Sequence, residues 1–272
     1  MSVFDTPSPR GRVLIIAGSD SGGGAGVQAD IKTVTALGGY AATAITAITV
    51  QNTLGVSAVH PIPASIVEAQ ARAVLDDIGA DAVKTGMLGD AVMVETVARV
   101  LDSASGLPAV IDPVMAAKGG AALLQGAAVD VVRSLMIPRA ALLTPNAPEA
   151  AALTGLAVET TEDLRRAGEA LLRLGARAVL MKGGHVAGER VVDVLMTGDG
   201  ETSFEAERLD TRHTHGTGCT LASACATGLA QGLPLTEAVA RAWAYVHEAM
   251  RRAPGFGAGH GPLDHAWPLR EA

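Results

Sequence analysis

The stretch VLIIAGSDSGGGAGVQA, residues 13–29, joins a short apolar run to a helical pattern through a glycine-rich loop. Val13–Ala17 is aliphatic throughout, which is typical of a strand buried on both faces of a sheet. The spacing of the apolar residues then predicts a helix from about Ala25 to Leu37. A strand, a loop and a helix in this order form the first half of a β-α unit.

The same order recurs along the rest of the chain. Short apolar runs predict further strands, and helical patterns lie between them. The predicted strands are 41–48, 56–62, 82–84, 109–111, 142–143 and 179–181, with a hairpin of 191–196 and 203–207 joined through Gly198–Gly200; the predicted helices are about 65–77, 91–101, 148–153, 161–174, 217–231 and 235–251. This order predicts an α/β fold, a central, mostly parallel sheet flanked by helices on both faces. Ligands of such sheets bind at the carboxyl ends of the strands.

The chain has 272 residues and shows neither an internal repeat nor an interdomain linker, so we expect a single domain over residues 1–272. Residues 1–12 and the Gly/Pro/His-rich residues 253–272 show no clear period. We expect both ends to be loosely ordered.

The charge, the hydropathy and the cysteine content of the sequence limit the kinds of partner and environment that we expect. The net charge is −7, and no basic run or basic–aromatic patch occurs, which argues against a nucleic-acid partner. No run of about 18 apolar residues is present, so we expect no membrane span. Cys219 and Cys225 would lie ~9 Å apart along one helix and on different faces, which excludes a mutual disulfide. Two unpaired cysteines favour a cytoplasmic protein.

The first glycine-rich loop invites two interpretations. Gly24–Ala29 loosely matches a dinucleotide-binding fingerprint, but no acidic residue follows between Asp30 and Glu68 to bind a ribose, which argues against a nicotinamide-dependent dehydrogenase. No phosphate-loop motif ending in Gly-Lys-Ser/Thr is present. Successive glycines that open a helix favour close approach of the backbone to a ligand, with a flexible loop as the alternative.

A second glycine-containing loop, Thr214–Thr220, opens the long apolar helix. Its alternating glycines allow the N–H groups of Gly216, Thr217 and Gly218 to point at one anion at the helix N-terminus. Cys219 lies in the first turn, where the helix dipole is expected to lower the pKa of its thiol. We therefore predict that Cys219 is the base for a substrate hydroxyl, and that Cys225 is an inert core residue.

Six motifs in this order resemble the hydroxymethylpyrimidine/phosphomethylpyrimidine kinases of thiamine biosynthesis. They are Ala17–Asp30, Val83–Leu88, Asp112–Met115, Thr144–Glu149, Lys182–His185 and the loop that ends at Cys219, and the resemblance covers roughly Val13 to Arg251. It implies a ribokinase-like fold and transfer of the γ-phosphoryl of Mg-ATP to a small hydroxymethylpyrimidine and then to its monophosphate. It also makes Cys219 the base and Gly216–Cys219 the anion hole. The chain could also form a homodimer.

The resemblance implies a pyrimidine site as well. The Gln51 carboxamide carries a donor beside an acceptor, which complements an amino group beside a ring nitrogen. Gly18, Met87 and Val114 match positions that line the ring, with core packing as the alternative for Met87 and Val114. Asp30 matches a pyrimidine-site position, and a structural role in the first helix is equally consistent with its place.

A separate site for the ATP phosphates is also expected, beside the pyrimidine site. Asn146 and Glu149 share a helix face, and Glu149 and Asp112 are candidate carboxylates for water-mediated Mg²⁺. Lys182 follows a strand and could neutralise phosphate charge, and Thr214 belongs to the ATP side by resemblance. His213 and His215 lack the further ligands of a transition-metal site. Lys118–Gly120 could form a mobile cover over the site.

Two alternatives stay open at this point. Some vitamin B6 kinases have similar sequences, so pyridoxal is the rival substrate. A ligand-binding relative without catalysis is the rival from another class, and the presence of Cys219, Glu149 and Lys182 argues against it.

Overall fold

The structure is a computed structural model that describes residues 10–115 and 126–270. An eight-stranded sheet in the order β10-β9-β8-β7-β6-β5-β1-β2 forms its centre, and a separate sheet pairs β3 with β4. The strands are β1 (Arg12–Ala17), β2 (Tyr40–Ile45), β3 (Ala47–Asn52), β4 (Gly55–Pro61), β5 (Ala82–Thr85), β6 (Ala109–Ile111), β7 (Leu142–Leu143), β8 (Ala178–Met181), β9 (Arg190–Thr197) and β10 (Gly200–Glu207). Strands β1, β2, β5, β6, β7 and β8 run parallel, and β9 and β10 form the antiparallel hairpin at one edge.

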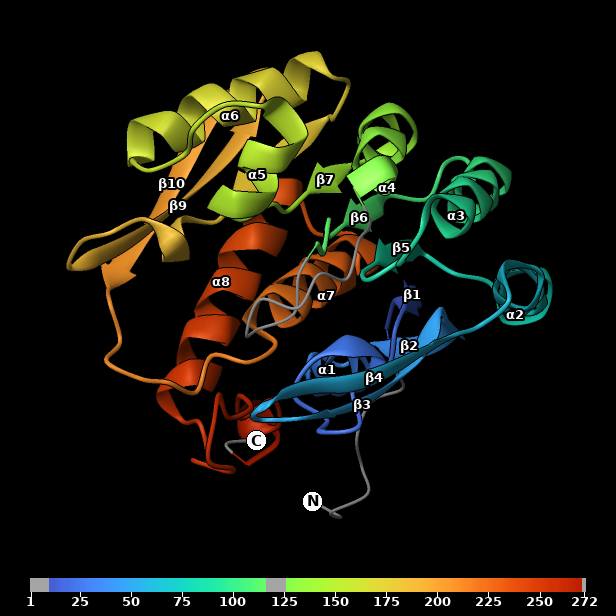
Figure 1. Ribbon diagram of the computed structural model, residues 1–272, viewed down its shortest axis with the longest axis horizontal. Coiled ribbons are helices and arrows are strands. Elements are labelled where there is room, and N and C mark those ends of the chain that lie inside the picture. Colours follow the sequence, from blue (N-terminus) through green and yellow to red (C-terminus); the bar gives the residue numbers. More distant parts are fainter. Residues whose placement is uncertain (1–9, 116–125, 271–272) are drawn as a thin grey trace.

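Helices cover both faces of the large sheet (Figure 1). They are α1 (Gly26–Ala36), α2 (Ala64–Ala73), α3 (Ala91–Ser103), α4 (Gly126–Val131), α5 (Ala147–Thr154), α6 (Thr161–Arg173), α7 (Thr217–Ala230) and α8 (Leu235–Arg251). Alternate residues of β1 divide the core in two. Leu14 and Ile16 pack with residues of α2, α3, α5 and α6, whereas Val13 and Ile15 pack with residues of α1, α7 and α8. The predicted α/β fold is therefore confirmed.

The first strand after α1 differs from its prediction. The apolar run expected as one strand, residues 41–48, is broken at Thr46 into β2 and β3. The Thr46 N–H donates to Ala17 at the end of β1, and the Thr46 hydroxyl donates to the Met87 carbonyl. Beyond Thr46 the chain leaves the large sheet, and β3 pairs only with β4. We call the β3–β4 hairpin the arm; Figure 1 shows it passing over α1.

The expectation of loosely ordered ends is wrong for the described part of the C-terminus. Leu263 and His265 are buried, and the N–H of Asp264 donates to Ala249 on α8. The N–H of His260 donates to Thr53 at the tip of the arm. At the other end, Arg12 already belongs to β1, while residues 1–9 lie outside the described residues. Hydrogen bonds to other segments hold the tail in place without a periodic pattern of its own.

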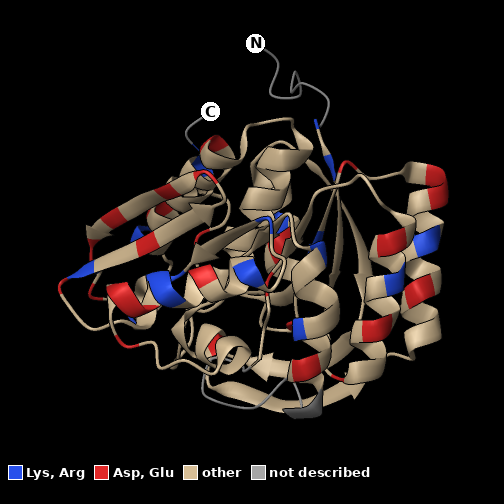
Figure 2. Ribbon diagram, turned by 90° about the horizontal axis from the view of Figure 1, so that it is seen from above, with Lys and Arg blue, Asp and Glu red and all other residues tan. Residues whose placement is uncertain are grey.

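Acidic and basic residues are interspersed over the outer helices, whereas the β9–β10 hairpin carries mainly acidic residues (Figure 2). Within residues 10–115 and 126–270, none of the helices combines the length and the apolar character needed to cross a membrane.

Candidate active site

The two glycine-containing loops meet at the N-terminus of α7. Gly216 is the N-cap residue of this helix, with φ +84°, a conformation that favours glycine. A Cβ atom at Gly216 would lie 1.8 Å from the carbonyl oxygen of Gly24, so only glycine allows the loops this close. The Thr217 hydroxyl donates to the Thr214 carbonyl at 2.7 Å, which ties the loop to the helix start. The sequence thus places Gly18–Gly26 and Thr214–Thr220 in one site.

A charged cluster lies beside this helix start. Lys182 Nζ is 3.0 Å from Asp112 Oδ1 and 3.8 Å from Glu149 Oε2. A Cβ atom at Gly218 would lie 3.0 Å from Lys182 Nζ, which shows that the ammonium group faces the predicted anion hole. Burial alone would lower the pKa of Lys182, but Asp112 and Glu149 outweigh it and raise that pKa. Lys182 therefore keeps its charge next to the loop.

Asn146 and Glu149 form a reciprocal cap at the start of α5. The Asn146 side chain accepts from the Glu149 N–H at 2.9 Å, and the Glu149 carboxylate accepts from the Asn146 N–H at 2.8 Å. Burial, together with the charge of Asp112, raises the pKa of Glu149 to about 7, although Lys182 opposes the shift. Burial thus disfavours the ionised form of the Glu149 carboxyl. A cation bound close to it would favour ionisation and lower its pKa.

Asp112 and Glu149 suit an outer-shell position for Mg²⁺. No group of three or more His, Cys, Asp or Glu side chains suited to a metal ion occurs among the described residues. Mg²⁺ keeps several waters and is bound through one or two carboxylates plus substrate phosphates, which fits this pair beside Lys182.

Cys219 follows Gly218 in the first turn of α7, as predicted, but its acidity was predicted wrongly. Burial raises the pKa of the Cys219 thiol to about 11. The charge of Lys84 and a backbone hydrogen bond from Gly26 oppose that shift without cancelling it. Although Cys219 is only half-buried, the loss of solvent around its sulfur outweighs the helix terminus, and the resting group is a thiol. Cys225 is buried, as expected for a core residue.

Lys84 was missed as a functional candidate. Its ammonium group lies 2.7 Å from Asp30 Oδ2 and 2.9 Å from Asp30 Oδ1, and neither side chain is exposed. Ser223 on α7 donates to the same carboxylate at 2.6 Å. The hydrogen bonds of the Asp30 carboxylate are thus made to Lys84 and Ser223. This favours a structural role for Asp30 over contact with a pyrimidine. A lysine in a strand predicted to be buried was the signal in the sequence.

Gln51 lies on the side of the arm that faces the loops. Its amide nitrogen is 3.3 Å from His215 Nε2, and that ring nitrogen is 2.8 Å from Asp20 Oδ2. The arm, the first loop and the second loop therefore meet at three polar side chains. The sequence pattern around His215 suggests only a metal ligand, so it does not predict the contact with Gln51.

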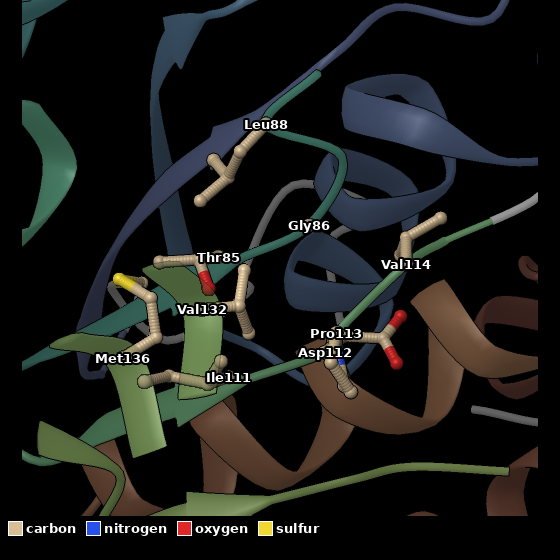
Figure 3. A pocket seen from close by; sticks show the side chains of 9 residues that line it. All are labelled: Thr85, Gly86, Leu88, Ile111, Asp112, Pro113, Val114, Val132 and Met136. Atoms are coloured by element: carbon tan, nitrogen blue, oxygen red, sulfur yellow. The ribbon is translucent and has the colours of Figure 1, made fainter. Parts of the chain in front are cut away.

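The expected ring-lining residues lie at the ends of β1, β5 and β6. A Cβ atom at Gly18 would lie 2.3 Å from Met87 Cε, so Met87 lies directly over Gly18. Val114 and Asp112 lie on the segment that leaves β6 (Figure 3). Val114, Thr85 and Met136 help to line a cavity of about 10 Å³, and the buried Thr85 hydroxyl has no hydrogen-bond partner. The predicted cover at Lys118–Gly120 lies outside the described residues.

Fold and site together define a ribokinase-like phosphotransferase: a mostly parallel sheet carries a glycine loop, a buried ammonium and two carboxylates at its strand ends. A family model described as phosphomethylpyrimidine kinase matches residues 20–264, and the chain belongs to this family.

Three relatives show how far the likeness extends. The hydroxymethylpyrimidine/phosphomethylpyrimidine kinase of Streptomyces coelicolor is 52% identical over 95% of this chain and 96% of its own length. The thiamine biosynthesis bifunctional protein of Geobacter sulfurreducens is 51% identical, and the chain spans 53% of that longer protein. An ADP complex of Bacillus subtilis pyridoxal kinase has a similar structure, with a TM-score of 0.89 and 36% identity over 97% of this chain and 100% of the other.

Proposed function

We propose that this chain transfers the γ-phosphoryl group of ATP to the hydroxyl of 4-amino-5-hydroxymethyl-2-methylpyrimidine, and then adds a second phosphate to the monophosphate, in thiamine biosynthesis. One observation carries the proposal: Cys219 lies in the first turn of α7, between two groups of polar residues. His215, in the loop before this helix, contacts Gln51 of the arm, and Gly218 faces the Lys182 ammonium. Acceptor and donor can thus meet at one thiol. The family to which the chain belongs supports the same reaction.

On the acceptor side, Gln51 would bind the aminopyrimidine edge and Met87, Gly18 and Val114 would flank the ring. Cys219 would act in its thiolate form, which would accept a hydrogen bond from the hydroxymethyl group and take its proton as the new P–O bond forms, so that the thiol is restored. Transition states of phosphoryl transfer are loose, so the proton leaves late and a strong base is not required at the start. Because the pKa of the Cys219 thiol is about 11, its own proton would first have to pass to solvent, and the charge of Lys84 favours the thiolate that this leaves.

On the donor side, the N–H groups of residues 216–219 and the Lys182 ammonium would hold the transferred phosphoryl group. Thr214 would contribute through the carbonyl that anchors Thr217. Asp112 and Glu149 would hold Mg²⁺ through water, and the ion would neutralise the charge on the ATP phosphates.

Pyridoxal is the second candidate acceptor, because a pyridoxal kinase has a similar structure over almost the whole chain. Assays of the purified protein with Mg-ATP and each of four substrates distinguish the two acceptors. The substrates are hydroxymethylpyrimidine, its monophosphate, pyridoxal and ribose. We expect the highest kcat/KM with the pyrimidines, and diphosphate as the final product. A higher kcat/KM with pyridoxal would overturn the assignment.

Four further expectations belong to this proposal. They are a single domain, a cytoplasmic location, no nucleic-acid partner and a homodimer. Ile48, Val50 and Val59 of the arm are 45%, 58% and 46% exposed, and they provide the apolar surface to test first for a second copy of the chain. Sedimentation of the wild type and of a Val50→Ser variant would show whether this surface pairs.

A further inference from the structure

The Gln51 carboxamide lies between two polar groups of the chain. Its oxygen is 3.3 Å from the Thr49 hydroxyl, and its nitrogen is 3.3 Å from His215 Nε2. His215 Nε2 is also 2.8 Å from Asp20 Oδ2, and the two residues are 7% and 1% exposed. Which of these neighbouring groups donate hydrogens and which accept them therefore decides the orientation of the Gln51 amide.

Asp20 is an ionised carboxylate. It accepts the N–H groups of Gly22 at 2.8 Å, Gly24 at 3.0 Å and Ala25 at 2.7 Å. Burial opposes ionisation, but His215 and these N–H groups outweigh it and lower the pKa of Asp20. The neighbouring His215 Nε2 must therefore carry a hydrogen and donate it. A Gln51 NH₂ group at the same ring nitrogen finds no acceptor.

Thr49 gives the matching result at the other end of the amide. Its hydroxyl has one hydrogen and donates it to the Ser19 carbonyl at 2.9 Å. Toward Gln51 it can therefore only accept. Turning the carboxamide by half a turn removes both conflicts: its nitrogen then donates to Thr49, and its oxygen shares the Nε2 hydrogen of His215 with Asp20 in a bifurcated bond.

We infer that Asp20, acting through His215, fixes the Gln51 carboxamide with its oxygen toward His215 and its nitrogen toward Thr49, and thereby sets the direction in which an aminopyrimidine binds. The inference deepens the proposed function and rests on it. The free edge of the amide presents an acceptor on the His215 side and a donor on the Thr49 side.

This orientation has a chemical consequence. The pyrimidine amino group must face the His215 side, and the adjacent ring nitrogen must face the Thr49 side. In the substrate the hydroxymethyl group is attached next to the carbon that carries the amino group, on the side away from that nitrogen. It therefore lies on the His215 side of the ring, and His215 belongs to the loop that leads into Cys219 at the start of α7. The opposite amide orientation would place the hydroxymethyl group on the Thr49 side. His215 and Asp20 are thus positioning residues.

The orientation can be tested without substrate. In the free protein, nuclear Overhauser contacts from the Gln51 side-chain NH₂ protons should reach the Thr49 methyl group. Contacts from those protons to the His215 ring instead would overturn the inference, whatever the enzyme phosphorylates.

A mutant cycle tests the consequence. The readout is the ratio of affinities, by calorimetry, for the aminopyrimidine and for an analogue that lacks the amino group. His215→Phe should lower this ratio about tenfold, the size of one hydrogen bond of about 1.4 kcal/mol. In a Gln51→Leu background it should change the ratio less than about twofold, since coupled residues are not additive.

Two matched variants at the other end keep the test independent of His215 and its folding. Thr49→Val should lower the ratio, whereas Thr49→Ser, which keeps the hydroxyl, should retain the wild-type value. An equal effect of His215→Phe with and without Gln51 would refute the positioning role. If the wild type instead binds the aminopyrimidine without phosphorylating it, the proposed function fails while the amide orientation is still decided by the cycle.

Discussion

Lys84 Nζ lies 2.7 Å from Asp30 Oδ2, and both side chains are fully buried. Lys84 comes from β5 and Asp30 from α1, and Ser223 of α7 completes the group four residues after Cys219. Although burial alone would lower the pKa of Lys84, the charges of Asp30 and Asp112 and the hydrogen bond to Asp30 raise that pKa. A charged pair therefore joins three elements directly behind the predicted catalytic residue.

Removal of one partner of this pair should be more damaging than removal of both. Lys84→Met leaves the Asp30 carboxylate buried without a counter-charge, which typically costs about 3–5 kcal/mol of unfolding free energy. A Lys84→Met/Asp30→Leu double variant should recover much of that loss. Urea unfolding of the wild type, both single variants and the double variant measures the effect. A double variant as unstable as the sum of the singles would contradict the pairing.

Cys219 is expected to act in the reaction rather than in binding. Cys219→Ala should reduce phosphoryl transfer by well over tenfold, about 1.4 kcal/mol of barrier per factor of ten, and leave the affinity for the pyrimidine almost unchanged. Single-turnover transfer and calorimetric binding measure the two effects. Cys225→Ala serves as the matched control, because this thiol is buried in the same helix away from the loops. Transfer above one-tenth of the wild-type rate would exclude Cys219 as the main base.

Glu149→Gln should increase the Mg²⁺ concentration needed for half-maximal activity, because a neutral amide replaces a carboxylate of the outer shell. The amide can still accept from the Asn146 N–H, so the cap of α5 is kept. A magnesium titration at saturating ATP gives the answer. An unchanged titration curve would place the ion elsewhere.

The sequence was informative where local pattern and tertiary role agree. Strand β1 is an unbroken aliphatic run and was predicted within one residue. The β9–β10 hairpin has glycines at its turn and was also predicted, although β10 begins at Gly200, three residues before its predicted start. The break at Thr46 carries neither Gly nor Pro, and it arises from contacts with Ala17 and Met87 that are distant in sequence. The pKa of the Cys219 thiol is likewise raised by burial, which depends on tertiary packing and cannot be predicted from a local motif.

The pH dependence of stability should contain a contribution from Glu149. The pKa of its carboxyl is about 7 in the folded protein, against an ordinary value of 4.5, so the folded state holds more protons than the unfolded state between these values. Ionisation of Glu149 therefore lowers stability as pH rises from about 4.5 to 7. Glu149→Gln should remove this fall, which unfolding free energies measured in steps of half a pH unit would show. The same slope in both proteins would argue against a buried, strained carboxyl.

His265 should contribute with the opposite sign. This buried residue of the C-terminal tail lies with Nε2 3.0 Å from the hydroxyl of Thr220, next to Cys219. Burial, and then the charge of Lys32, lower the pKa of His265 to about 4 from an ordinary 6.5. Between these values the unfolded state binds more protons, so stability should be lost as pH falls from about 6.5 to 4.

In the wild type the contributions of His265 and Glu149 oppose one another where their pH ranges overlap, from about 4.5 to 6.5. His265→Gln, which keeps a polar group but cannot be protonated, should therefore leave a protein whose stability falls as pH rises from about 4.5 to 7. Glu149→Gln should leave one whose stability rises over that range. Because His265 contacts Thr220, acid should also release the tail from α7. A lower protection of the Thr220 amide against hydrogen exchange near pH 4.5 than near pH 7, each relative to the intrinsic rate at that pH, would report this release. Unchanged exchange at Thr220, together with an unchanged slope in His265→Gln, would mean that the tail does not stabilise the start of α7.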